Sequence, residues 1–268
     1  MVTPIAALAV EGLTVAFNGP PVVRDVSFAV QPGERVALIG ASGSGKSLTA
    51  ASVAGSTPRS ARVSGRVRVD GVDVLGVPVG RRPTGGRIAL VSQDPSAALN
   101  PLVPVGAQLA MPLRARHGLR AVALSDALTA RLAAVGIEDP ERVLRSSPGE
   151  LSGGQRQRIC IAIALACRAS VLVADEPTTA LDLVTQAQVV DVLRRTTGDT
   201  GLLFITHDIA VASSLCHRAV VLAGGEVVEE GTPAQLFAEP RHPHTRSLVE
   251  SARRTALLRP ARPARAPA

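Results

Sequence analysis

The stretch "RVALIGASGSGKS", residues 35–47, decides the fold of this chain. Its first residues are mostly apolar and predict a fully buried strand, and "KSLTAASVAG" has the composition of a helix that ends at Gly55. Residues 40–47 between them fit the pattern G-x-x-x-x-G-K-[ST], in the strand–loop–helix context that this pattern requires. In such a loop, backbone N–H groups converge on phosphate oxygens and the helix N-terminus adds its positive end. The stretch therefore predicts a phosphate-binding loop in an α/β fold.

Lys46 is the only lysine in the chain, since all other basic residues are arginine. A compact ammonium can enter a phosphate cradle between backbone N–H groups, whereas a planar guanidinium is wider. We therefore expect Lys46 to contact phosphate, and chance survival of a single lysine is the alternative. Ser47 could ligate Mg²⁺. The residues predicted to bind the nucleotide here are Gly40, Ser42, Gly43, Ser44, Gly45, Lys46 and Ser47.

A second buried strand, "VLVADEP" at residues 171–177, runs into two acids. Ligands of open α/β sheets bind outside the carboxyl ends of the strands, which is where Asp175 and Glu176 would lie. We expect Asp175 to hold Mg²⁺, directly or through water, and Glu176 to orient and deprotonate an attacking water. An acidic turn that caps a helix is the structural alternative.

The string "LSGGQ", residues 151–155, is the most specific motif of the chain. Ser152 and two glycines precede the helical stretch "QRQRICIAIALA", which gives a second helix N-terminus able to receive phosphate. A serine N-cap followed by a glycine turn is the simpler interpretation, but it does not explain a second phosphate cradle. The residues predicted to bind nucleotide here are Leu151, Ser152, Gly153, Gly154 and Gln155.

Strands and helices alternate along most of the chain, which predicts a mostly parallel sheet. "GRVRVDGVDV", residues 65–74, predicts a hairpin around an Asp70-Gly71 turn. Residues 97–158 contain short amphipathic helical pieces broken by Gly and Pro, and predict a helical insertion in the α/β core. A final turn is expected at "EEGTP", residues 229–233.

These motifs together resemble the ATP-binding subunits of ABC transporters, over essentially residues 8–250. The resemblance implies a P-loop NTPase (RecA-like) core with a mainly parallel sheet, an N-terminal antiparallel β subdomain and an inserted α-helical subdomain. It implies one ABC ATPase domain over residues 1–250, with ATP and Mg²⁺ as ligands. It also implies that two such subunits meet head to tail and hold each ATP between the Walker A loop of one and the signature of the other.

The resemblance also assigns roles to single residues. Glu176 is the expected catalytic base, Lys46 stabilises charge on the γ-phosphate, and His207 in "ITHD" contacts that phosphate and helps to hold the water. Gln93 in "VSQDP" is the expected Q-loop glutamine, with a catalytic role and a place in the metal site beside Ser47 and Asp175. Asp182 belongs to the expected D-loop and is expected to bind nucleotide. Phe17 stands where the family stacks an aromatic ring on adenine, and a core Phe is the alternative.

A narrower resemblance is to importers of the dipeptide/oligopeptide/nickel family. The resemblance rests on the stretches "VSQDPSAALNP", "ADEPTTALDLVTQAQVV" and "PRHPHTRSLVES". The last stretch departs from the family pattern, because His244 stands where that family has Tyr. A metal site at His242 and His244 is a minor alternative. The resemblance implies two transmembrane permeases, an extracytoplasmic substrate-binding protein and a second, non-identical ATPase, with this chain at the cytoplasmic face of the inner membrane. The resemblance does not decide whether the transported solute is a dipeptide, an oligopeptide, nickel or a metallophore.

Three other functions are alternatives: an ATPase subunit of an ABC exporter, a DNA-associated ABC-type ATPase and a ribosome-acting ATPase of the translation-factor type. The last class is expected to carry two cassettes in one chain, and only one set of these motifs occurs here. The DNA-associated class needs a long coiled coil between the first glycine loop and LSGGQ, and no heptads occur there. The net charge of +7 comes largely from residues 251–268, which carry five arginines and no acid and are expected to form a disordered Arg/Pro/Ala-rich tail. No basic stripe with interleaved aromatics occurs elsewhere, so we expect no nucleic-acid partner.

The remaining composition points to a cytosolic environment. Cys160, Cys167 and Cys216 form no CxxC pair, and their apolar neighbours predict buried free thiols. The N-terminus is a poor signal peptide, and the longest apolar run, residues 159–167, is well short of the roughly 20 residues of a membrane span. We therefore expect a soluble protein that reaches a membrane only through a partner.

Overall fold

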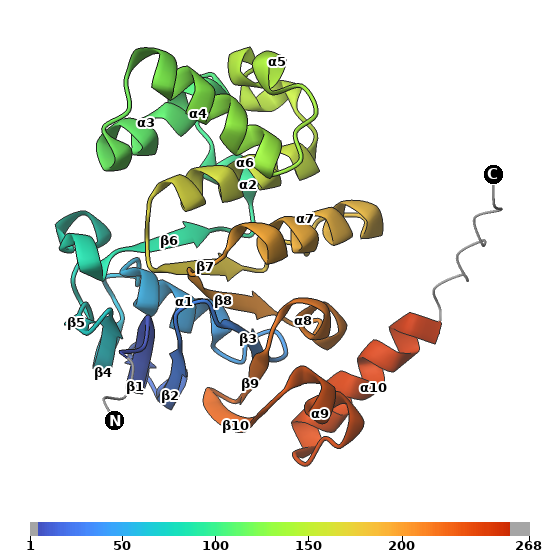
Figure 1. Ribbon diagram of the computed structural model, residues 1–268. Coiled ribbons are helices and arrows are strands. Elements are labelled where there is room, and N and C mark those ends of the chain that lie inside the picture. Colours follow the sequence, from blue (N-terminus) through green and yellow to red (C-terminus); the bar gives the residue numbers. More distant parts are fainter. Residues whose placement is uncertain (1–4, 258–268) are drawn as a thin grey trace.

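The computed structural model describes residues 5–257, which form two sheets and three groups of helices (Figure 1). One sheet has four strands in the order β2-β1-β4-β5, and the other has six in the order β10-β9-β3-β8-β7-β6. The strands are β1 (Leu8–Ala16), β2 (Val23–Val30), β3 (Arg35–Ile39), β4 (Arg62–Val69), β5 (Val72–Asp73), β6 (Ile88–Val91), β7 (Val171–Asp175), β8 (Gly201–Thr206), β9 (Arg218–Ala223) and β10 (Glu226–Gly231).

The six-stranded sheet is parallel from β9 to β6, and only the pair β9–β10 is antiparallel. Its central strands are continuous apolar runs because both faces are covered, as in "GLLFIT" of β8, where every residue is buried. In the parallel register Ile39 pairs with Thr206, and Asp175 pairs with Ile205. The carboxyl ends of β3, β7 and β8 therefore lie side by side, which brings the glycine loop, the acid pair and His207 to one edge of the sheet.

The four-stranded sheet is antiparallel throughout. The predicted hairpin is confirmed, since β4 and β5 pair across Asp70 and Gly71, which both have the positive φ that a tight two-residue turn requires. Alternate residues of β1 and β2 are buried and pack against α1 and the larger sheet, in one of the two hydrophobic clusters. The expected N-terminal antiparallel subdomain is thus present beside the parallel core.

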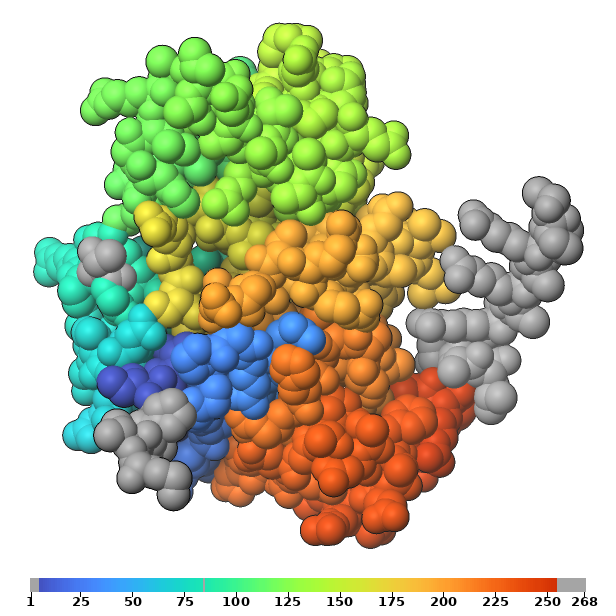
Figure 2. Space-filling view, in the orientation of Figure 1, coloured from blue at the N-terminus to red at the C-terminus, as the bar shows by residue number. Residues whose placement is uncertain are grey.

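The helices of the described residues fall into a central helix, an inserted group and a C-terminal group. They are α1 (Lys46–Ala54), α2 (Pro95–Ala98), α3 (Val105–His117), α4 (Ala121–Ala134), α5 (Pro140–Arg145), α6 (Gly153–Ala166), α7 (Leu183–Thr196), α8 (Ile209–Leu215), α9 (Pro233–Ala238) and α10 (Pro243–Leu257). Short 3-10 turns lie at Val79–Arg81, Thr84–Gly86 and Pro148–Glu150. The inserted helices α3, α4 and α5 form a lobe above the sheets in Figure 2, which agrees with the helical insertion predicted at residues 97–158.

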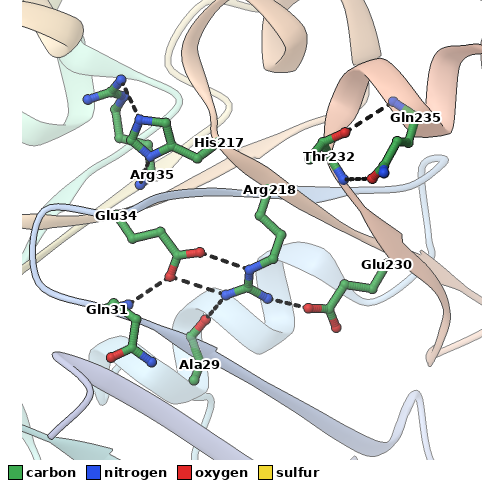
Figure 3. Close-up of polar contacts among 9 residues, drawn as sticks. All are labelled: Ala29, Gln31, Glu34, Arg35, His217, Arg218, Glu230, Thr232 and Gln235. Atoms are coloured by element: carbon green, nitrogen blue, oxygen red, sulfur yellow. Dashed lines mark hydrogen bonds and ion pairs between the residues drawn. The ribbon is translucent and has the colours of Figure 1, made fainter. Parts of the chain in front are cut away.

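A polar network joins the amino ends of the larger sheet to the antiparallel subdomain (Figure 3). The Arg218 guanidinium, at the start of β9, donates to both carboxylate oxygens of Glu34, at 2.8 and 3.2 Å, and also to Glu230 of β10 and the carbonyl of Ala29 in β2. Glu34 accepts a further hydrogen bond from Gln31 N at 2.8 Å. These bonds tie four chain segments together at the edge opposite the glycine loop.

Three sequence-based expectations differ from the structure. The turn expected at residues 229–233 is instead the end of strand β10, whose apolar alternation is broken by a register shift between Val227 and Glu229. Helix α10 continues to Leu257, so the first seven residues of the expected disordered tail are helical, and residues 258–268 lie outside the described part. Cys160 and Cys216 are buried free thiols as expected, but Cys167 is only partly buried.

Two further observations concern membranes and metals. Within residues 5–257, no helix is both long enough and apolar enough to cross a lipid bilayer. His242 and His244 lie close, since His244 N–H donates to His242 Nδ1 at 3.2 Å. The described part of the chain nevertheless holds no cluster of three or more His, Cys, Asp or Glu side chains that could bind a metal. Among the described residues, no third side chain of these types joins His242 and His244 to complete the metal site that was the minor alternative.

Candidate functional site

The glycine loop lies between β3 and α1, and its glycines are required by close packing. A Cβ on Gly40 would lie 2.4 Å from both the carbonyl oxygen of Leu222 and Ser44 Oγ. Gly45 has a φ of 100° and is the N-cap of α1, with no side chain to cap the first turn. The N–H groups of that turn have no partner within the helix, so they are free to bind an external acceptor. The cradle expected from the sequence is therefore present.

Lys46 folds back over this loop. Its side chain is 5% exposed, and Nζ donates to Gly40 O at 2.8 Å and to Ala41 O at 3.0 Å. An ammonium has three donors, so one is left for a further acceptor. Burial lowers the pKa of Lys46, although the charges of Glu176 and Asp175 partly oppose this effect. Ser44 Oγ is buried beside it and has no hydrogen-bond partner in the described part of the chain. A buried cation with a spare donor, and a buried hydroxyl without a hydrogen-bond partner among the described residues, fit a phosphate group in this glycine cradle.

Ser47 and Asp175 meet between the start of α1 and the end of β7. Ser47 Oγ donates to Asp175 Oδ1 at 3.4 Å. Burial, and then the charge of Glu176, raise the pKa of Asp175, while Ser47 and Lys46 partly offset the rise. A hydroxyl and a carboxylate whose charge is poorly compensated form an oxygen pair of the kind that Mg²⁺ prefers. These two residues therefore fit the divalent cation that accompanies a nucleotide.

Glu176 is held in an unusual backbone conformation at the same edge. Its φ is 45°, in the left-handed region that non-glycine residues rarely adopt, and its N–H donates to Ile205 O at 3.0 Å. The carboxylate accepts a hydrogen bond from Thr179 Oγ1 at 2.8 Å and lies 3.3 Å from Nδ1 of His207. The Glu176 side chain is 15% exposed and that of His207 is 51% exposed. Strain of this kind concentrates at functional sites, and here it places a fixed carboxylate against an accessible imidazole.

The LSGGQ segment, residues 151–155, forms the N-terminal end of helix α6. Ser152 Oγ accepts a hydrogen bond from Gln155 N at 3.2 Å, and Gln155 Oε1 accepts one from Ser152 N at 3.0 Å, which is a capping box. Arg156 Nη1 donates to Leu151 O at 2.7 Å. The simpler interpretation of Ser152 as an N-cap is thus confirmed as local structure, and Ser152 and Gly153 remain accessible for another role.

Gly154 connects this segment to the expected D-loop. A Cβ on Gly154 would lie 2.2 Å from Thr185 Cγ2 of α7. Thr185 Oγ1 in turn donates to Asp182 Oδ2 at 2.6 Å, and Asp182 Oδ1 caps α7 by accepting from the N–H groups of Val184 and Thr185, both at 3.0 Å. These bonds lower the pKa of Asp182. The start of α6 and the start of α7 are therefore in direct contact.

Two predicted site residues stand apart from these contacts. Gln93 follows β6 and is exposed, and among the described residues no hydrogen bond joins it to Ser47 or Asp175. Phe17 follows β1, is half-buried, and belongs to neither of the two hydrophobic clusters of the described residues. The structure therefore favours an accessible ring over the alternative of a core Phe.

A sequence profile of the ABC transporter family matches residues 23–179, more than half of the chain. The chain belongs to the ABC transporter family. Its ABC domain is 41% identical over 252 residues to a peptidoglycan transport ATP-binding protein of Agrobacterium fabrum, covering 90% of this chain and 46% of that relative. It is 43% identical over 260 residues to an oligopeptide transport ATP-binding protein of Mycobacterium tuberculosis, covering 91% and 41%. The chain thus spans about half the length, or less, of these relatives.

The fold of this ABC domain also matches a solved ATP-binding cassette, captured as a dimer in a post-hydrolysis state with ADP and Pi. The TM-score is 0.71 at 27% identity, covering 84% of this chain and 98% of that one. The match supports an ATP-binding P-loop fold and agrees with the two sheets and inserted helices described above. ATP binding is thus the established ligand chemistry of the family to which this domain belongs.

Several residues of the ABC site were missed by the sequence analysis. Thr179 donates a hydrogen bond to the Glu176 carboxylate, and Arg156 donates one to the carbonyl of Leu151. Thr185 leaves no room for a side chain at position 154. Thr179 lies three residues after Glu176, so its position in "DEPTT" is the one signal that could have found it. Thr185 and Arg156 carry no pattern of their own, because their roles depend on contacts between helices.

Proposed function

We propose that this chain hydrolyses ATP as the energy-coupling subunit of an ABC importer for peptides or a related small solute. The observation that carries the proposal is the convergence of Lys46, Ser47, Asp175, Glu176 and His207 at one edge of the parallel sheet. The names of the relatives, one a peptidoglycan and the other an oligopeptide transport ATP-binding protein, support the choice of solute.

The phosphates of ATP would lie in the cradle of Gly40 to Ser47, against the N-terminus of α1 and the free donor of Lys46. The half-buried ring of Phe17 would stack on adenine. Ser47 and Asp175 would hold Mg²⁺, and Gln93 would complete the site from the loop after β6. When bound, Mg²⁺ supplies charge neutralisation at the phosphate oxygens.

Glu176 would orient the attacking water and accept its proton during in-line attack on the γ-phosphate. Its carboxylate already has two partners, Thr179 and His207, so its position is set before substrate arrives. His207 is half-exposed and would contact the γ-phosphate through the ring edge that faces away from Glu176. Lys46 would stabilise the charge that develops on the phosphoryl oxygens.

The LSGGQ segment would act on a nucleotide bound by a second ATPase subunit. Within one chain the segment starts α6, and its accessible Ser152 and Gly153 can face another molecule. A head-to-tail pair would place these residues, with Asp182, against the nucleotide of the partner. We propose that the partner ATPase is non-identical, and that two permeases and an extracytoplasmic binding protein complete a transporter at the inner membrane, with this chain on its cytoplasmic face.

The test is to express the chain with its candidate permeases and purify the complex. The expected result is ATPase activity in membranes that is stimulated by a peptide-loaded binding protein. An ATPase stimulated by a solute on the cytoplasmic side alone would favour the exporter. Activity stimulated by DNA, with no permease recovered, would favour the DNA-associated class.

A further inference from the structure

Arg82 is the largest fully buried side chain of the described residues, with 2% of its surface exposed. It lies just after the 3-10 turn Val79–Arg81, six residues before β6 begins. Within residues 5–257, no carboxylate forms an ion pair or hydrogen bond with its guanidinium. Arginine stays protonated even where burial lowers its pKa, as it does here. A buried cation without an anion is costly, so its presence calls for a specific role.

The partners of Arg82 are carbonyl groups at the far end of the phosphate-binding helix. Nη1 donates to Val53 O, and Nε donates to Val77 O, both at 2.9 Å. Val53 lies in the last turn of α1, where carbonyls have no partner within the helix. The N–H groups of Gly55 and Ser56 donate to the carbonyl oxygens of Ser52 and Ala51, respectively. Arg82 donates to the carbonyl oxygen of Val53.

The fit around this guanidinium is tight. A Cβ on Gly55 would lie 2.4 Å from Arg82 Nη2 and 2.8 Å from Val77 O. Nη2 itself is buried and has no partner in the described part of the chain. Helix α1 carries no basic residue in its own last turn. Arg82 is therefore the cation at the negative end of α1, supplied by a segment that lies 29 residues further along the chain.

We propose that Arg82 is a positioning residue for nucleotide binding, which fixes the C-terminal end of α1 so that its N-terminal end presents Lys46 and the cradle to phosphate. This inference rests on the proposed function. Helix α1 is only nine residues long, so a shift at Val53 is transmitted along a rigid rod to Lys46. A positive charge at the C-terminal end also complements the dipole whose positive end faces the phosphates. Arg82 acts through α1 and does not contact the nucleotide.

The test compares ATP affinity with fold stability in four variants. Arg82→Met removes the charge and both hydrogen bonds at similar length, and Arg82→Lys keeps the charge. Arg81→Met changes the exposed neighbour. Leu236→Ala opens a cavity in α9, remote from α1, and serves as the control for general loss of stability. The dissociation constant for ATP is measured by calorimetry at a temperature where circular dichroism shows each variant to be folded.

We expect Arg82→Met to weaken ATP binding about tenfold, and Arg82→Lys to weaken it by more than about twofold but less than Arg82→Met does. Arg81→Met and Leu236→Ala are expected to bind within about twofold of the wild type. Hydrogen exchange of the amides of α1 should be faster in Arg82→Met and unchanged in Leu236→Ala.

Binding by folded Arg82→Met within about twofold of the wild type would overturn the inference. Equal weakening in Leu236→Ala would also overturn it, because general stability would then explain the loss. If Arg82→Met does not fold, the ATP affinity of Arg82→Lys is judged by the same limit of about twofold. A lysine keeps the charge but cannot donate to both carbonyls with the geometry of a guanidinium. A wild-type chain that binds no ATP would contradict the proposed function as well, so the two failures are distinguishable.

Discussion

Nδ1 of His207 lies 3.3 Å from Oε2 of Glu176, although the two residues directly follow different strands of the parallel sheet, β8 and β7. The contact exists because β7 and β8 pair in a register that sets Asp175 opposite Ile205. It fixes the carboxylate between an imidazole and the hydroxyl of Thr179, at a residue whose backbone is strained. The sheet thus positions a candidate base before any substrate binds.

The first prediction follows from this arrangement. Glu176→Gln keeps the size of the side chain and an oxygen for Thr179, but it removes the group that accepts a proton. We expect ATP turnover to fall by about a hundredfold or more, while ATP binding stays within about twofold. Steady-state ATPase assays and calorimetry measure the two quantities. Glu239→Gln, at an exposed position after α9, is the control, and hydrolysis at the wild-type rate in Glu176→Gln would remove Glu176 from the catalytic role.

Lys46→Arg tests whether the sole lysine is irreplaceable. Lys46 is 5% exposed, and its ammonium donates to two carbonyls of its own loop, at 2.8 and 3.0 Å. A guanidinium is wider and offers its donors in a fixed fork, so it cannot occupy this position without moving the loop. We expect ATP affinity to fall about tenfold or more, as for the loss of a hydrogen bond to a charged group. Lys46→Met should show a similar loss, and full binding by Lys46→Arg would refute the steric argument.

Asp175→Asn should stabilise the ligand-free protein in a pH-dependent way. The pKa of Asp175 is raised in the fold by burial and by Glu176. The folded state therefore keeps this proton to higher pH than the unfolded chain does. Proton binding by Asp175 thus stabilises the fold at low pH, and this part of the free energy of unfolding is lost as pH rises through the folded-state pKa. The neutral amide avoids that loss, so the melting temperature of the variant should exceed that of the wild type by a few degrees at pH 7.

The difference between the two melting temperatures should shrink as pH falls toward the unfolded value of about 3.9. Calorimetric scans without nucleotide measure it, and Asp191→Asn, at a half-exposed acid on α7 that pairs with Arg195, is the control. A constant difference across the pH range, or a lower melting temperature for Asp175→Asn at pH 7, would show that the carboxylate charge is not disfavoured in the fold.

Phe17→Ala probes the aromatic contact with the base. Phe17 is half-buried and outside both hydrophobic clusters of the described residues, so its removal leaves no core cavity. We expect ATP affinity to fall by about fivefold to tenfold, with the melting temperature nearly unchanged, and Phe17→Leu to recover only part of the binding. A large loss of stability with unchanged ATP affinity would instead assign Phe17 to the fold.

Sequence patterns could predict those parts of the site that are contiguous in the chain. The glycine loop, "VLVADEP" and "LSGGQ" each carry their chemistry within a few residues, next to a buried strand or a helix start. The register of neighbouring strands then follows from their parallel pairing. The meeting of Lys46, Glu176 and His207 at one edge of the sheet was therefore predictable. The contact between Arg82 and Val53 was not, because 29 residues separate them and no periodicity links them.

Two errors in the fold have local causes. In "EVVEEG" of β10 a register shift between Val227 and Glu229 breaks the alternation that identifies a strand, and the Glu and Gly residues resemble a turn. The tail was judged from its charge, but "SARRTAL" at residues 251–257 consists largely of good helix formers, and helix α10 continues through it.

Gly154→Ala offers a test of the contact between the starts of α6 and α7. The added methyl would lie 2.2 Å from Thr185 Cγ2, a distance that no packing tolerates, so the Thr185 side chain must rotate away from its bond to Asp182, or α6 or α7 must move. We expect a loss of about 1–3 kcal/mol in the free energy of unfolding, as for overpacked cores, and reduced ATPase activity in the assembled transporter. Thr185→Ser removes the clashing methyl and keeps the hydroxyl that donates to Asp182.

The double variant Gly154→Ala/Thr185→Ser should therefore recover stability, because the remaining Thr185 atoms near the new methyl lie at 3.5 and 3.6 Å, which is ordinary contact. Denaturant unfolding of the four members of this cycle measures the coupling between the two sites. If stability recovers and activity does not, the glycine at position 154 contributes to activity apart from packing, which would support its proposed contact with the nucleotide of a second subunit. If neither recovers, the clash between Gly154 and Thr185 is not the cause of the defect.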